Sequence, residues 1–551
     1  MFSSSCDTMV AMNDVTDDGS IIFAKNSDRQ ANEPLSTRYI PSSTYPSSSK
    51  VKTTYIEVDQ VEETYSCVLF SPANIFGAEM GFNCHGLVVG NEALFTKVSS
   101  DNEGLTGMDL VRLVLERCRT SREGKNEIVL LISKYGQGGN CGFTSQLYYH
   151  SSFLLVDSTE CWIVETVGKD YAAKMITKGI YTISNIISFG GVETFDEYSE
   201  NLIEYAICKG WCQSKEDFHF QKCYSGFSYH PNEFYNGFLK TQLACSQMRR
   251  TRSNELIHKR HKKFNVLDMF HILRDHQCSQ ENPSSGLTNI DICMHAGFGP
   301  IRFNQTTGSL VSVLPTNTNQ IPTHYATCTS VPCLSVFKPI WLDSEMKPPR
   351  FLSLDDEGNL GNATCTFSLN SIWWKSEIMT RNIVKYYRKL IKEIEIERDE
   401  LERELVAKSK QLSMKNVLHE ERKQWTIFSF DKVDQLSNQW LSRSSSLSLE
   451  MESELSSIQE FAWEKWRTAA QIPEHLLTYS KIGYTKNLLL SIGLLVILIF
   501  IWIFLTNNSD QRYTILCLLL LNYVFIYQIL VKRTKRKTNS SVELLRFNFN
   551  D

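Results

Sequence analysis

The hydrophobic and polar positions of this chain change their period along its length. Short apolar runs bounded by turn residues, the pattern of β-strands, fill residues 6–100, at 55–58, 66–70 and 87–91. Residues 107–119 and 126–135 predict two helices, the second ending at Gly136. A strand meander is expected at residues 152–157, 161–166 and 170–176. Strands, paired helices and further strands indicate a sandwich of sheets with helices on its outer faces.

The middle of the chain is less regular. Residues 209–260 are rich in aromatic and basic residues and follow no clear period. A helix is expected over Asn265–Arg274, and strand pattern returns over Thr288–Val313 with a turn at Gly308. Residues 341–364 form a connection that contains Pro and Asp.

A long helix is expected from Ile372 to about Lys410. Its apolar residues recur at spacings of three, four and seven, and its other faces are rich in Glu, Lys and Arg. This pattern fits an amphipathic helix packed on the domain, and it also fits a short coiled coil, which would allow helix-mediated self-association. Residues 442–457 are rich in Ser and predict a flexible linker.

Two strongly apolar runs lie near the C-terminus, at residues 488–505 and 513–531. At about 1.5 Å per residue the first is roughly 27 Å long, close to a hydrocarbon core of about 30 Å. A buried pair of soluble helices is the alternative, but the first run is apolar on every face. We expect a transmembrane hairpin. Lys and Arg flank both runs and are concentrated in residues 532–537, which places both ends in the cytosol.

Composition narrows the class of protein. The net charge is −4, and the first 480 residues contain no basic stripe, so nucleic acid is not an expected partner. The 16 cysteines form no paired framework and no hydrophobic signal precedes Cys6, which favours reduced thiols in the cytosol. The cysteines that first suggest a metal lack tight Cys-x-x-Cys spacing, so no metal and no cofactor are expected; they are Cys208, Cys212, Cys328 and Cys333.

Cys6 is the leading candidate for chemistry. It follows a short leader of small residues and opens an apolar, strand-like run. If the Ser5–Cys6 bond is cut, one residue carries both a thiol and a free α-amine. An α-amine has a pKa of roughly 7.7–8 and can accept the thiol proton near neutral pH. The alternative is a buried cysteine in a first strand.

A second strand is expected to end beside Cys6. Residues 20–29 deliver Lys25, Asn26 and Asp28 after a turn at residues 17–19. A carboxylate at Asp28 would orient the new α-amine, and Lys25 would favour the thiolate. A solvated polar turn is the alternative. The three glycines of residues 136–141 either bring backbone N–H groups to a substrate or make a sharp connection.

Several segments together carry a family resemblance. They are Thr54–Val61, Phe76–Asn83, Gly90–Ala93, Gly107–Leu113, Tyr135–Cys141, Gln305–Val313 and Val336–Pro339. The chain resembles the secernins, a branch of the peptidase C69 family whose other members are bacterial dipeptidases, over about residues 1–400. The resemblance implies the N-terminal-nucleophile hydrolase fold, an α+β αββα four-layer sandwich, with a processed N-terminal Cys as nucleophile and amide hydrolysis as the reaction.

The resemblance also implies roles for single residues. Cys6 is expected to be the nucleophile and Asp28 to position the α-amine. Lys25 stands where related hydrolases often carry Arg, and we expect it to bind substrate as a single-point cation. Asn91 is expected to donate to the oxyanion, and Asn185 matches the second asparagine of the site. Either Arg249 or Arg250 is expected to add an arginine.

The sequence therefore predicts a membrane-tethered cysteine hydrolase that acts on short peptides or another small amide, in the manner of a dipeptidase. A secernin-type protein that acts in exocytosis or membrane trafficking through protein partners, without catalysis, is the alternative. The expected parts are a propeptide (1–5), the hydrolase domain (6–365), a helical extension (366–440), a Ser-rich linker and pre-membrane segment (441–487), two transmembrane helices (488–505 and 513–531) and a basic cytosolic tail (532–551).

Overall fold

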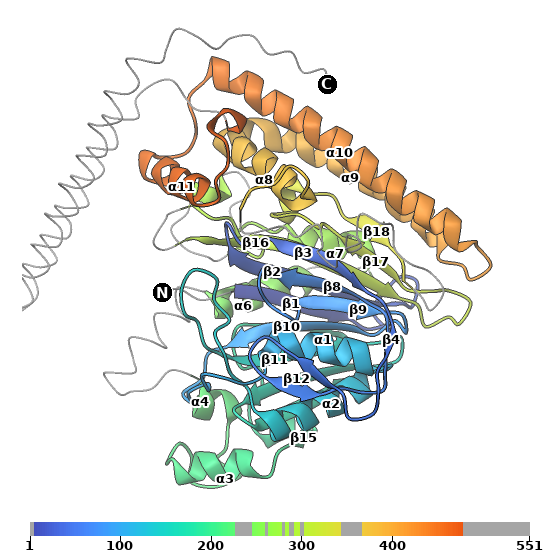
Figure 1. Cartoon of the computed structure of the whole chain (residues 1–551), viewed down its shortest axis with the longest axis vertical. Coiled ribbons are helices and arrows are strands. Elements are labelled where there is room, and N and C mark those ends of the chain that lie inside the picture. Colours follow the sequence, from blue (N-terminus) through green and yellow to red (C-terminus); the bar gives the residue numbers. More distant parts are fainter. Residues whose placement is uncertain are drawn as a thin grey trace, which may run out of the picture.

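A computed structural model describes most of the chain (Figure 1). The described residues are 5–225, 245–258, 263–277, 282–285, 291–297, 302–342 and 366–477. Two large antiparallel sheets form the centre of the molecule, and helices cover both of their outer faces.

The first sheet has six strands, most of which come from the two ends of residues 5–342. Its order is β14 (Ile180–Ser184), β1 (Ser5–Ala11), β2 (Ile21–Gln30), β16 (Asn304–Leu314), β17 (Thr323–Ala326) and β18 (Lys338–Ile340). Strand β16 is continuous through Gly308, where the sequence predicted a turn. The register instead shifts between Thr306 and Gly308, so the glycine marks a β-bulge and the turn prediction is wrong.

The second sheet has eight strands. Its order is β15 (Glu197–Tyr198), β13 (Asp170–Ile176), β12 (Cys161–Val167), β11 (His150–Val156), β10 (Val88–Leu94), β9 (Met80–Asn83), β8 (Cys67–Pro72) and β3 (Leu35–Ile40). Strands β11 to β13 are the predicted meander. Two small ribbons pair β4 (Ser43–Thr44) with β7 (Glu63–Thr64) and β5 (Lys50–Lys52) with β6 (Glu57–Asp59).

Successive side chains of each strand point to opposite faces of its sheet, so the apolar core is divided into layers. Val10 and Phe23 of the first sheet pack against Phe82 and Leu154 of the second, so one core lies between the sheets. Helices α1 (Gly107–Arg117) and α2 (Ser121–Tyr135) cover the outer face of the eight-stranded sheet. Helices α6 (Ser246–His258) and α7 (Val266–Leu273) cover the outer face of the six-stranded sheet. The predicted αββα order of layers is confirmed.

Local sequence explains the ends of the two predicted helices in the outer layer. Thr106 caps α1 through a reciprocal capping box with Asp109. Gly136 follows α2 with φ 74°, a backbone conformation that favours glycine, and so ends the helix where the sequence predicted. Shorter elements complete the domain: α3 (Asn201–Cys208), α4 (Phe220–Tyr224), η1 (Val192–Thr194), η2 (Pro283–Ser285) and η3 (Pro332–Leu334).

A helical extension packs on the six-stranded sheet and on its loops (Figure 1). It comprises α8 (Ile372–Ile383), η5 (Val384–Tyr386), α9 (Tyr387–Leu412), α10 (His419–Glu450), α11 (Ser457–Ala469) and η6 (Glu474–Leu476). The predicted long helix is present but is interrupted by η5. Tyr387, Leu390 and Ile394 of α9 are buried against the domain. The amphipathic alternative therefore describes this helix, and self-association stays a prediction.

The predicted Ser-rich linker is wrong over residues 442–450, whereas residues 451–456 lie between two helices. Helix α10 continues through residues 442–450, and the hydroxyls of Ser444 and Ser445 both donate back to the carbonyl of Leu441. Apolar packing around Trp440 holds this segment helical despite its composition. The helical extension thus continues past residue 440, the position at which the sequence predicted its end.

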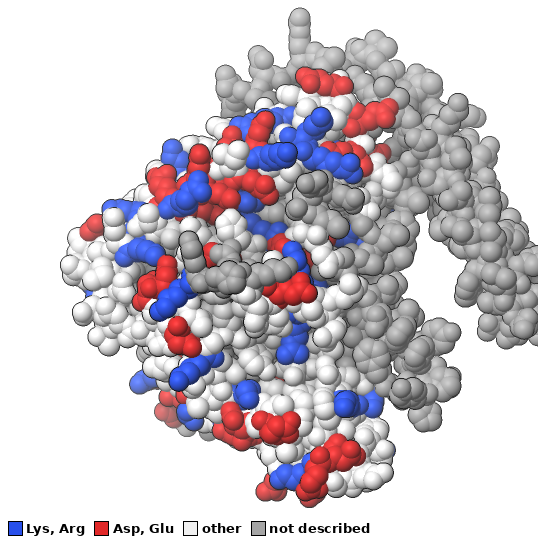
Figure 2. All heavy atoms as spheres, turned by 180° about the vertical axis from the view of Figure 1, so that it is seen from behind, with Lys and Arg blue, Asp and Glu red and all other residues white. Residues whose placement is uncertain are grey.

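On the face in Figure 2, Lys and Arg are intermixed with Asp and Glu over the described residues. None of the described helices is long and apolar enough to cross a membrane. The two predicted spans, 488–505 and 513–531, and the basic tail lie outside the described residues.

Candidate active site

Cys6 lies in β1, between β14 and β2, and is almost fully buried. Its backbone N–H donates to Oδ1 of Asn185, with 2.7 Å between the two atoms. Its sulfur accepts the backbone N–H of Asp28 at 3.4 Å. The nitrogen that would become the α-amine therefore already has a side-chain acceptor, and the thiol has a donor that favours the thiolate.

The Cys6 thiol points into the layer between the sheets, as Lys25 does. Cys6 alternates with Val10 on one face of β1, and Lys25 shares a face of β2 with Phe23, and both apolar residues belong to the inter-sheet core. Burial raises the pKa of the Cys6 thiol well above its ordinary value, while the charge of Lys25 lowers it. The charge of Lys25 therefore offsets part of the cost of burying a thiolate at Cys6.

Glu92 is the partner of Lys25. Its Oε1 lies 3.5 Å from the Lys25 ammonium and also accepts the hydroxyl of Thr8. Burial raises the pKa of Glu92 to about 8, against the lowering effect of Lys25. Burial lowers the pKa of Lys25, but the negative groups around it, Cys6 and Glu92 first, raise it above its ordinary value overall. Lys25 is therefore charged and paired with Glu92 inside the site.

The opposite face of β1 carries a buried ion pair. Arg249 of α6 donates through Nε to Asp7 at 2.8 Å and through Nη2 to Oδ1 of Asn185 at 2.9 Å. The same Nη2 lies 3.3 Å from the carbonyl oxygen of Cys6. Arg250 instead donates to the carbonyl of Thr182. Of the two arginines between which the sequence left a choice, the structure brings Arg249 to Cys6.

Asp28 lies on the same side as Asp7 and Arg249, not on the side of the thiol. Its Oδ1 accepts the hydroxyl of Thr306 at 2.7 Å. Burial raises the pKa of Asp28 to about 7, although Arg249 lowers it. The β1–β2 register pairs Asp28 with Ser5, so its backbone borders the bond expected to be cut.

Asn91 is not brought to Cys6. It pairs across strands with Phe153, which belongs to the core under α1 and α2, so its side chain is on the outer face of the eight-stranded sheet. A Cβ on Gly107 would lie 2.8 Å from its Nδ2, which places the amide against the start of α1. Its neighbour Glu92 faces the thiol layer instead. The geometry contradicts the expected role of Asn91 as oxyanion donor, because adjacent strand residues point to opposite faces.

An acidic group that the sequence motifs did not predict lies beside the thiol. The Cys6 sulfur lies 4.0 Å from Oε2 of Glu79. Arg29 lies 3.2 Å from Glu79 and 2.5 Å from Glu33, and it also donates to the carbonyl of Cys141 at 2.9 Å. The sequence does contain a signal for Arg29, because residues 25 and 29 of β2 lie on the same face of the strand. The contact with Cys141 brings the end of the glycine-containing loop to the site.

Comparison with known protein families identifies the family of this chain. The model of Peptidase family C69 matches residues 5–399. This chain belongs to peptidase family C69. Membership of a peptidase family supports hydrolysis of an amide bond as the reaction. The match is to the family C69 as a whole, and the secernin branch stays a prediction.

Solved structures offer only distant likenesses. A mutant conjugated bile acid hydrolase from Clostridium perfringens has 12% identity and a TM-score of 0.31, over 58% of this chain and 88% of that one. Penicillin V acylase from Agrobacterium tumefaciens has 13% identity and a TM-score of 0.31, over 62% and 90%. An N-acylethanolamine-hydrolyzing acid amidase orthologue from Caenorhabditis elegans has 13% identity and a TM-score of 0.26, over 57% and 94%. Scores this low carry no argument about function.

Proposed function

We propose that this C69 member is a cysteine hydrolase that matures by cleavage of the Ser5–Cys6 bond and then cleaves short peptides. The observation that carries the proposal is the position of Cys6. Its backbone nitrogen bonds to Asn185, its sulfur bonds to the N–H of Asp28, and Lys25 lies in the same layer. Nucleophile, base and cation thus meet around one residue.

The reaction has two halves. The α-amine takes the thiol proton, the sulfur forms a bond to the substrate carbonyl carbon, and the amine then returns that proton to the leaving nitrogen as the amide bond breaks. Water next attacks the thioester, the amine accepts and passes on its proton, and the acid leaves with the thiol restored. The positive charge of Arg249 lies close to the Cys6 backbone. It therefore disfavours protonation of the α-amine, which keeps the amine available as a base.

The substrate class follows from charge. Glu33 and Glu79 share the single guanidinium of Arg29, so this group of three side chains carries one net negative charge, separate from the Lys25–Glu92 pair, and Glu79 lies 4.0 Å from the thiol. A small pocket beside this group is lined by Arg29, Glu33, Cys141 and Asn304. This arrangement favours a substrate with a free ammonium group near the scissile bond, as an unblocked dipeptide has.

A dipeptide panel with N-acetylated counterparts tests the function. The purified full-length protein should cleave unblocked dipeptides better than acetylated ones, and Glu79→Gln should narrow that difference. Cys6→Ala should abolish cleavage, while Cys84→Ala, which removes a half-buried thiol after β9, should not. If processed, folded wild type cleaves no amide and Cys6 resists a thiol-directed probe, the proposal fails and a role through protein partners becomes the better account.

We further propose that residues 488–505 and 513–531 tether the enzyme to a membrane, with the hydrolase domain in the cytosol. Their apolar composition and basic flanks support this. The test is alkaline carbonate extraction, followed by protease protection of tags at both ends. Retention in the membrane with both tags on the cytosolic side is expected, whereas release by carbonate would rule out the hairpin.

A further inference from the structure

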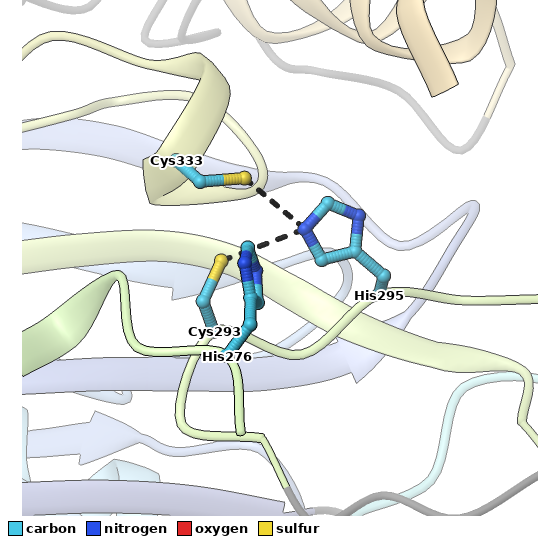
Figure 3. A group of neighbouring side chains, drawn as sticks. All are labelled: His276, Cys293, His295 and Cys333. Carbon is cyan, nitrogen blue, oxygen red and sulfur yellow. Dashed lines mark hydrogen bonds between the residues drawn. The ribbon is translucent and has the colours of Figure 1, made fainter. Parts of the chain in front are cut away.

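Four side chains of zinc-ligand type meet outside the candidate active site (Figure 3). They are His276, Cys293, His295 and Cys333, and their ligand atoms all lie within 4.8 Å of one another. Nε2 of His295 lies 3.6 Å from the Cys293 sulfur and 3.1 Å from the Cys333 sulfur. A tetrahedral zinc ion with bonds of about 2.0–2.3 Å holds such atoms roughly 3.3–3.8 Å apart.

We propose that these four residues bind one structural zinc ion. Two cysteines and two histidines form a closed tetrahedral set with no position left for substrate, as in structural rather than catalytic zinc sites. The ion would bind both sulfurs as thiolates. The two thiolates then balance the charge of Zn²⁺, so the buried centre is neutral, which lowers the cost of placing the ion away from water.

The surroundings of the histidines fit a metal. Nε2 of His276 is a buried atom with no hydrogen bond of ordinary geometry to the described residues, although the Cys333 sulfur lies near it. Nδ1 of the same ring lies 3.4 Å from the Tyr387 hydroxyl of α9. With the Nδ1 proton donated to Tyr387, the lone pair on Nε2 is free for the ion, which is how outer contacts commonly orient a ligating histidine.

The loops that carry the ligands are already fixed by buried arginines. Arg398 of α9 donates to the carbonyl of Cys333 at 2.6 Å, Arg274 donates to that of Pro332 at 2.9 Å, and Arg302 donates to that of His295 at 2.9 Å. These contacts hold the backbone without using the ligand atoms. A site held in this way loses little conformational entropy when it binds an ion.

The position of the cluster gives the ion a structural task. His276 follows α7, Cys293 and His295 lie in the segment 291–297, and Cys333 lies in η3 under α9. The segment 291–297 is bonded to β16, where Met294 and Thr306 exchange hydrogen bonds, and Thr306 donates to Asp28. Zinc would therefore join the end of α7, the segment bonded to the strand that supports Asp28, and the η3 turn on which α9 packs.

Metal analysis of full-length protein purified without chelators tests the site. The expected zinc content is about one equivalent per chain, falling at least fivefold in Cys293→Ser and in Cys333→Ser. Cys328→Ser is the matched control, because this buried cysteine precedes the same loop but belongs to the inter-sheet core, and it should keep its zinc. Cobalt exchanged into wild type should give tetrahedral d–d bands and thiolate charge transfer.

Three results would overturn the proposal. The first is wild-type protein, expressed with added zinc, that holds no metal and gives no cobalt spectrum; this result does not depend on whether a variant folds. The second is zinc content unchanged in both cysteine variants, which would place the metal elsewhere. The third is a native Cys293–Cys333 disulfide found by non-reducing peptide mapping, because a disulfide would consume both thiolates.

Discussion

The backbone nitrogen of Cys6 and the side-chain oxygen of Asn185 are 2.7 Å apart. Asn185 follows β14 directly, and its Nδ2 donates to the carbonyl of Ala93 in the other sheet. Its orientation is thus set by both sheets, and it holds the nitrogen that would become the α-amine after the proposed cleavage. In the proposed mechanism the base is therefore positioned by a residue 179 places away in the sequence.

Asn185→Ala should lower kcat by about 10²-fold and leave KM little changed, because it removes the acceptor that orients the base and not a substrate contact. Steady-state kinetics on a cleaved dipeptide measure the effect. Asn254→Ala is the control, since Asn254 lies on the adjacent α6 and bonds Thr182. Equal kinetics for Asn185→Ala and wild type would contradict the assigned role.

Arg249 and its neighbour Arg250 should differ sharply when replaced. Arg249→Met leaves Asp7 buried without its cation, and breaking such a pair costs about 3–5 kcal/mol of unfolding free energy. Arg250→Met removes a contact with one carbonyl and should cost much less. Denaturant unfolding of the two variants makes the comparison. Similar losses from both would show that the Arg249 network does not support the site.

The stability of the protein should depend on the charge of Asp28. Its folded pKa of about 7 exceeds the ordinary value of about 3.9, so between these limits the folded protein keeps a proton that the unfolded chain has lost. The free energy of unfolding must therefore fall as pH rises through that window and be level above it. Asp28→Asn removes this contribution.

The comparison for Asp28 is made at pH 5 and pH 8. The denaturant midpoint should fall less between these values in Asp28→Asn than in wild type, while the exposed Asp431→Asn should behave as wild type. Other raised carboxyls, such as Glu92, contribute equally to all three proteins and cancel in the difference. A slope unchanged by Asp28→Asn would refute the assignment.

The helical extension should depend on one buried carboxylate. Both nitrogens of the Arg274 fork bind Glu402 of α9, at 2.7 and 2.5 Å, and Glu402 also accepts the N–H of Phe337. Glu402→Ala should lower the unfolding free energy by about 3–5 kcal/mol, because the buried Arg274 loses both of its short carboxylate contacts and keeps only Asp399, at 3.9 Å. Glu400→Ala, an exposed change on the same helix, should have little effect. Thermal unfolding of the two variants, compared with wild type, tests this difference in stability.

Much of the fold was predictable because its signals are local. The capped start of α1, the glycine after α2 and the meander β11–β13 all follow from neighbouring residues. The failures have tertiary causes. Packing of Trp440 overrides a Ser-rich composition in α10, and pairing with β2 draws Gly308 into a bulge rather than a turn.

The site was predictable only where a motif fixed the strand face. Cys6, Lys25 and Asn185 were expected together and lie together, whereas Asn91 points to the other side of its sheet from Glu92. A sequence motif identifies candidate residues, but it does not show which of two adjacent strand residues points toward the site. The four proposed zinc ligands come from three segments, and Cys333 lies 38 residues beyond His295, so their spacing does not form a compact ligand motif.

The intact mass of active, purified protein tests the central claim most directly. Cleavage at Ser5–Cys6 predicts the loss of residues 1–5 and an N-terminal Cys6, because the nitrogen that bonds Asn185 is an amide before cleavage and becomes a basic α-amine only afterwards. If cleavage is autocatalytic, Cys6→Ala should retain the five residues. Active wild-type protein that still begins at Met1 or Phe2 would contradict the mechanism.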